Sequence, residues 1–136
     1  MTDTTTTDAR REEVFAEIRE RRGFLLPLHE LMGNLDPEIL SAYNSLAGSL
    51  LFGPEPKALD LKTRFLVLLG VTTAVKGDRE GVEWSIRGAR KHGATDDEIS
   101  EAMLLAGLPA GMPAVEYAAH AWQEMDKGRG IVETDD

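Results

Sequence analysis

A serine inside an apolar helical stripe is the first residue whose position could serve chemistry. Ser85 lies between Val82 and Ala89 in the apolar stripe that we expect on a helix over residues 79–91. A hydroxyl that faces the interior of a bundle could donate to a developing oxyanion. The structural alternative is a small packing residue that bonds a carbonyl of its own helix. The sequence leaves both interpretations open, and we predict Ser85 as a catalytic residue.

Three histidines could supply a proton near neutral pH, which a serine hydroxyl cannot do. His29 follows Pro27 in an apolar segment that we expect to be a loop over a pocket, so we predict His29 as the general acid. A structural role for His29 is equally supported. His92 and His120 are the lower candidates, because His92 ends a helix, where a cation complements the dipole, and His120 flanks an apolar stripe.

Composition excludes several classes of function. The 136 residues contain no cysteine, so disulfides and thiol chemistry are excluded, and a net charge of -9 opposes binding to nucleic acid. The histidines lie far apart without a metal-binding spacing, and no phosphate-cradling loop is present, so we expect no metal and no cofactor. We find no apolar run near the ~20 residues of a membrane span and no signal-peptide core, and we expect a cytoplasmic protein.

Helical spacing of apolar residues recurs from residue 39 to 125, and no segment alternates with period two. Helix starts are predicted at Asp8, Asp36, Asp60, Arg79, Thr95 and Pro113. These signals predict an all-α fold of about six helices. We expect a disordered tail over 1–7, one domain over 8–127 and a polar tail over 128–136.

The order of motifs in the centre of the chain resembles the carboxymuconolactone decarboxylase family of the alkylhydroperoxidase D-like superfamily. The matching residues are Leu59–Arg64, Ile86–Ala89, Gly93–Thr95, Glu98 with Ile99, and Gly111 with Pro113 and Ala114. The resemblance covers roughly residues 36–125. It implies an alkylhydroperoxidase D-like helical bundle that assembles into homotrimers or homohexamers, with a pocket between the central helices.

The resemblance also identifies departures. The peroxidase-like branch carries Cys-x-x-Cys-x-x-x-His where this chain has Asp78, Gly81 and Ser85. Without thiols that redox chemistry cannot operate, which makes the decarboxylase branch the closer relative. Many relatives have a carboxylate at the position of Phe65, and decarboxylases often have a histidine at that of Leu105.

Two functions follow from these observations. The first is a cofactor-independent lyase that acts on a small carboxylated ring or lactone-like metabolite, with Phe65, Arg64, Arg87 and Leu105 binding the substrate. The second is a non-catalytic or repurposed member, acting for example in isomerisation or binding. An apolar cavity that contains Ser85 and a histidine would favour the first function. A site filled by Phe65 and Leu105 would favour the second.

Overall fold

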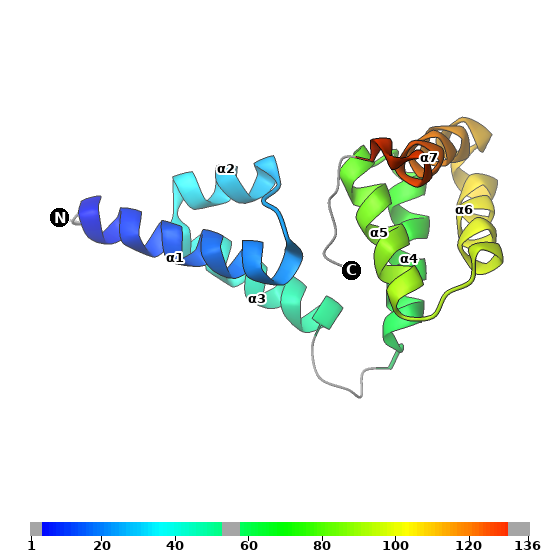
Figure 1. Ribbon diagram of the computed structural model, residues 1–136. Helices are drawn as coiled ribbons and strands as arrows, with labels where there is room; N and C mark the ends of the chain where they lie inside the picture. Colours follow the sequence, from blue (N-terminus) through cyan, green and yellow to red (C-terminus); the bar gives the residue numbers. More distant parts are fainter. Residues whose placement is uncertain (1–3, 53–57, 131–136) are drawn as a thin grey trace. The chain divides into compact units, whose positions relative to one another are not determined.

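The computed structural model describes residues 4–52 and 58–130, and every regular element within these ranges is a helix (Figure 1). The predicted all-α fold class is confirmed. Seven α-helices and one π-helix, η1, are described: α1 Thr4–Arg22, α2 Pro27–Leu35, α3 Pro37–Phe52, α4 Leu61–Ala74, α5 Arg79–Lys91, α6 Asp96–Ala110, α7 Met112–Glu124 and η1 Met125–Arg129.

The chain divides into two compact units. The first contains α1 to α3, and the second contains α4 to η1. A single domain over 8–127 therefore stays a prediction. The predicted polar tail over 128–136 lies mostly outside the described residues.

The first unit is built around an apolar cluster that α1 shares with α3. Val14, Phe15 and Ile18 of α1 are buried with Leu40 of α3. The apolar residues of α1 form only a thin stripe in the sequence, yet with Leu40 they make up the core of this unit. The helix also begins at Thr4, before the predicted start at Asp8, and Asp8 instead pairs with Arg11 at 2.7 Å.

The segment expected to be a loop around His29 is helical. Pro27 occupies the first turn of α2. Backbone N–H groups in a first turn have no carbonyl partner within the helix, so the N–H that proline lacks is not needed there. Gly33 lies so close to α1 that an added Cβ would meet the Phe15 ring at 2.6 Å. Asp36 then ends α2, and its carboxylate accepts the Glu38 N–H at 3.0 Å, so α3 begins at the predicted position.

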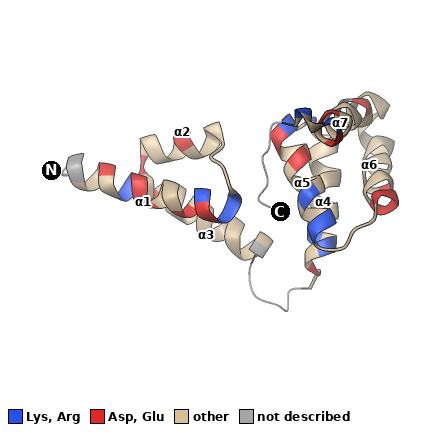
Figure 2. Cartoon of the chain, in the orientation of Figure 1, with Lys and Arg blue, Asp and Glu red and all other residues tan. Residues whose placement is uncertain are grey.

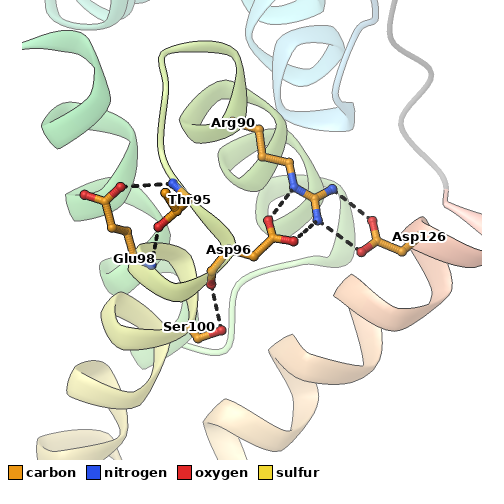
Figure 3. Close-up of polar contacts among 6 residues, drawn as sticks. All are labelled: Arg90, Thr95, Asp96, Glu98, Ser100 and Asp126. Carbon is orange, nitrogen blue, oxygen red and sulfur yellow. Dashed lines mark hydrogen bonds and ion pairs between the residues drawn. The ribbon is translucent and has the colours of Figure 1, made fainter.

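Side-chain caps start the three central helices of the second unit. Asp60 accepts the Thr63 N–H at 2.8 Å, and Asp78 accepts the Gly81 N–H at 2.8 Å. Thr95 and Glu98 form the predicted reciprocal capping box at the start of α6 (Figure 3). These caps determine where α4, α5 and α6 begin and therefore which of their side chains share a face.

The core of the second unit lies where α4, α5, α6 and α7 meet. Fully buried apolar side chains come from each of them, including Leu69, Val82, Ile86, Ile99 and Ala118. Lys62 near the start of α4 donates to Glu98 near the start of α6 at 3.0 Å, and farther along Gly70 lies against Ala102. The two helices therefore run side by side in the same direction.

Candidate functional site

Ser85 lies on the buried face of α5, as its place in the stripe predicts. Its side chain is 1% exposed, and its hydroxyl donates to the Gly81 carbonyl at 2.7 Å. The donor is therefore used within its own helix, one turn earlier. Thr73 of α4 is bonded in the same way, to Leu69 at 2.8 Å. These bonds match the structural alternative for Ser85, a packing residue that bonds its own helix.

Phe65 stands in an aromatic cluster between α4 and α5. Its ring packs edge-on against Trp84, with centroids 5.2 Å apart, and stacks on the His92 ring at 5.5 Å. Phe65 is 2% exposed, and Gly88 leaves room for it. Two predicted site residues, Phe65 and His92, are thus brought together. Trp84, the third member of the cluster, is buried against Phe65.

His92 is the half-buried member of this cluster. It follows α5 directly, and its backbone N–H is bonded to the carbonyls of Gly88 and Ala89 at 3.2 Å. Partial burial lowers the pKa of His92 from its ordinary value of 6.5, and the charge of Lys91 lowers it further. Its imidazole is therefore mainly neutral at pH 7 while remaining within reach of solvent protons.

The two arginines predicted to bind an anion have different surroundings. Arg64 is buried at the start of α4 and donates from Nε to the Leu59 carbonyl at 2.8 Å. Arg87 is partly buried on α5, where its charge helps to lower the pKa of Asp126, an effect led by the hydrogen bond from Arg90. Arg64 therefore stabilises the segment that leads into α4. Arg87 lies on the side of α5 that faces Asp126 of η1.

The other two histidines are not members of the aromatic cluster. His29 belongs to the first unit and lies in the first turn of α2, where it is 3% exposed. His120 lies on α7 with an exposed side chain, 3.2 Å from Glu116 one turn earlier. The first placement corrects the expectation that His29 lies in a loop. Its predicted role as a general acid remains a prediction.

An open apolar groove of about 540 Å³ runs between α4 and α6. Leu105 lines it, and Glu98 and Glu101 are its polar members. Acidic side chains also gather in the first turn of α6 (Figure 2). The predicted pocket was to lie among α4, α5 and α6 with Ser85 inside, but this groove takes its lining from α4 and α6, and Ser85 is not part of it.

Comparison with known proteins identifies the family. The family model described as "Carboxymuconolactone decarboxylase family" matches residues 37–124. The chain belongs to the carboxymuconolactone decarboxylase family. The 4-carboxymuconolactone decarboxylase of Acinetobacter baylyi is 36% identical over 69 residues, which are 51% of this chain and 51% of that protein. The chain thus matches about half the length of this curated relative.

A solved structure supports the fold. The crystal structure of a proposed carboxymuconolactone decarboxylase from Burkholderia xenovorans LB400 superimposes with a TM-score of 0.64. The superposition covers 90% of this chain and 98% of the Burkholderia chain, and the two sequences are 23% identical. The predicted resemblance is therefore confirmed at the level of family and helical fold.

Asp78, Gly81 and Ser85 lie at the start of α5, with Asp78 as its N-cap residue. Here they form a chain of local hydrogen bonds, since Asp78 accepts the Gly81 N–H and Gly81 accepts the Ser85 hydroxyl. This member of the carboxymuconolactone decarboxylase family thus uses these positions to hold the first turns of a helix.

Sequence reasoning missed a polar cluster that α5 forms with residues later in the chain. Glu83 is fully buried and pairs with Arg79 at 3.2 Å, while Arg79 also donates to the Arg129 carbonyl at 2.7 Å. Arg90 donates to Asp96 at 3.0 Å and to Asp126 at 2.9 Å (Figure 3). The four-residue spacing of Arg79 and Glu83 was a signal that could have indicated the pair.

The described residues offer neither a metal site nor a membrane span. No group of three or more histidine, aspartate or glutamate side chains within residues 4–52 and 58–130 could hold a metal ion. Among the helices of those same ranges, none has the length and apolar character that crossing a bilayer requires.

Proposed function

We propose that this family member is a cofactor-independent lyase that decarboxylates a small carboxylated ring or lactone-like compound. The name of the Acinetobacter baylyi relative supports this reaction class. In such a reaction the bond to the carboxylate breaks, carbon dioxide leaves, and the electron pair passes into an enolate. A proton then returns to carbon, so the site must supply a cation or donor for the oxyanion and a general acid.

The observation that carries the proposal is the stacking of His92 on Phe65 beside Trp84. Aromatic rings make one side of the imidazole apolar, and an apolar surrounding strengthens hydrogen bonds to a developing charge. The imidazole is also partly open to solvent, from which it can regain a proton. We therefore assign the general acid to His92, ahead of His29 and His120.

A specific observation favours a second function, that of a member without decarboxylase activity. Phe65 fills the space between α4 and α5, and the Ser85 hydroxyl is bonded to Gly81. Where these side chains replace the polar groups of relatives, the scaffold could serve binding or isomerisation instead. This second function predicts a folded protein that releases no carbon dioxide.

The proposal includes an assembly of copies in the cytoplasm, as the resemblance implies. Helices α4 and α6 and the residues that follow them carry seven large apolar side chains that are at least half exposed: Val67, Val71, Val75, Leu104, Leu105, Leu108 and Met112. Soluble monomers rarely leave such an extended apolar surface open. A homotrimer or homohexamer would cover it.

The experiment measures carbon dioxide release from 4-carboxymuconolactone and from a panel of small carboxylated lactones and β-keto acids. His92→Gln should lower turnover by about 10²-fold, because general acid catalysis typically contributes that much. His120→Gln is the matched control with an exposed histidine, and it should leave turnover unchanged. Ser85→Ala should have a smaller effect than His92→Gln, since it removes a single hydrogen bond.

The pH profile provides a separate readout. Because the acid must be protonated, wild-type turnover should fall as pH rises through the pKa of His92, which lies below 6.5. His92→Gln should lose this limb of the profile. Full activity of His92→Gln would refute the assignment of the acid. No release from any substrate by folded wild-type protein would favour the second function.

A further inference from the structure

His29 makes a hydrogen bond that only a neutral imidazole can make. The backbone N–H of Leu26 donates to Nδ1 of His29 at 3.0 Å. Leu26 is the residue that precedes α2, and His29 is the third residue of the helix. The bond therefore reaches back from the first turn to the N-cap, which is half of the reciprocal arrangement that glutamate or glutamine usually makes at this position.

The backbone of the same turn depends on the geometry at Leu26. The Leu26 carbonyl accepts the His29 N–H at 2.9 Å and the Glu30 N–H at 3.3 Å. Leu26 has no side-chain oxygen, so the usual N-cap acceptor is missing. The His29 ring thus provides the side-chain hydrogen bond that closes this helix start.

The groups packed around His29 do not favour a charged ring. The side chain is 3% exposed. From α1 it faces the positive charge of Arg22, and from α3 it meets the Tyr43 ring at a centroid distance of 6.1 Å. On α2 itself the neighbouring carboxylate is that of Glu30, which is exposed. An imidazolium here would be buried beside another cation and would present an N–H to the Leu26 N–H.

We propose that His29 is a proton-operated latch of α2, closed while the ring is neutral and opened by protonation. When a proton binds to Nδ1, the lone pair that accepts the Leu26 N–H is lost, and the first turn of α2 is released. No covalent step and no ligand are needed.

The direction of the pH dependence follows from linkage. Burial, and then the charge of Arg22, lower the pKa of His29 below its ordinary value of 6.5 in the closed state. The open state therefore binds protons more readily. The closed latch is fully stable above about pH 6.5 and loses stability as pH falls from there towards the lower pKa of the closed state.

Opening of the latch would change the exposed apolar side of α2. The outer side of α2 carries Leu28, Leu31 and Leu35, which are 40%, 70% and 78% exposed. The inner side packs through Gly33 on Phe15 and Leu40. Release of the first turn would leave the Gly33 contacts intact and would change the orientation of Leu28, so the device would alter an apolar surface without unfolding the unit.

The test is hydrogen exchange of individual amides by NMR on the full chain, corrected for intrinsic exchange rates. Between about pH 7.5 and about pH 5, the amides of residues 26, 29 and 30 should lose about tenfold of their protection. Amides of Val14 and Ile18 in α1 should not change. Imidazole nitrogen shifts at neutral pH should show the tautomer with the proton on Nε2.

Two substitutions separate the latch from other titrations. His29→Gln keeps an acceptor at the third helical position but does not titrate, so its α2 amides should stay protected at both pH values. His29→Ala should lose that protection at both values. Equal pH sensitivity in wild type and His29→Gln would overturn the proposal, and so would a proton on Nδ1 at neutral pH.

Discussion

At Gly88 the absence of a side chain allows an aromatic ring to lie against the backbone of α5. A Cβ at this position would overlap the Phe65 ring, which cannot turn away easily because it is held by Trp84 and His92. Glycine inside a helix costs about 1 kcal/mol relative to alanine. At Gly88 the packing of the Phe65 ring offsets this cost. The packing of Phe65 against α5 thus depends on a second residue.

We predict that Gly88→Ala lowers the free energy of unfolding by about 1–3 kcal/mol, the usual effect of overpacking a core. Chemical denaturation measures it. In a Phe65→Leu background the same substitution should be neutral or stabilising, because the smaller side chain leaves room for the methyl group and alanine favours the helix. Equal effects in both backgrounds would show that Phe65 is not the obstacle.

The sequence could place Ser85 on the buried face of α5, because helical spacing alone decides that. It could not decide whether the hydroxyl would be free, since the i−4 bond to Gly81 depends on the rotamer. The contact between Phe65 and His92 could not be predicted from the sequence, for a different reason. Residues 27 positions apart come together only through the packing of α4 on α5.

At the scale of elements, one arginine joins three segments. Arg90 of α5 bonds Asp96 at the start of α6 and Asp126 in η1 (Figure 3). Its guanidinium also lies 5.5 Å from the centre of the Trp122 ring. The hydrogen bond from Arg90 holds the pKa of Asp126 below its ordinary value of 3.8. The contribution of this pair is therefore present above about pH 4 and is lost as pH falls through the lowered pKa.

We expect the Arg90–Asp126 pair to show a coupling energy of about 0.5–1 kcal/mol in a double-mutant cycle at neutral pH. The cycle uses Arg90→Gln and Asp126→Asn, and thermal unfolding measures it. The coupling should weaken as pH falls through the lowered pKa of Asp126, because protonation removes the charge of the carboxylate. As a control, the exposed pair of Arg10 and Glu38, which is formed at 2.7 Å, should show weaker coupling. A coupling that persists in acid would exclude the ionic explanation.

The capped starts of α4 and α6 were predictable, and the start of α2 was not. Asp60 and Thr95 were recognised because an acceptor side chain precedes an apolar run. The start of α2 was missed because Leu26 is no cap residue and the acceptor comes from His29 inside the helix. Gly33, farther along α2, serves close packing on Phe15.

At the scale of the whole molecule, large apolar side chains of α4 and α6 are exposed to solvent in the single chain. The α4–α6 face exposes Val71 and Leu105 at 56% and 57%, and Leu108 at 74%. The sequence of α4 is apolar almost all round, which is typical of a helix that is buried on several sides. Within the second unit only part of that surface is covered.

The last prediction concerns this face. If copies of the chain cover it, sedimentation at micromolar concentration should give three or six times the chain mass of 14.9 kDa. Leu105→Glu should reduce the mass toward that of one chain, because it would bury a carboxylate beside Glu101 in an apolar contact. Leu59→Glu is the control, since that side chain is 46% exposed outside the groove. A wild-type monomer would contradict the prediction. An assembly that tolerates Leu105→Glu would place the contact elsewhere, because a buried unpaired carboxylate at the centre of an apolar interface prevents stable association.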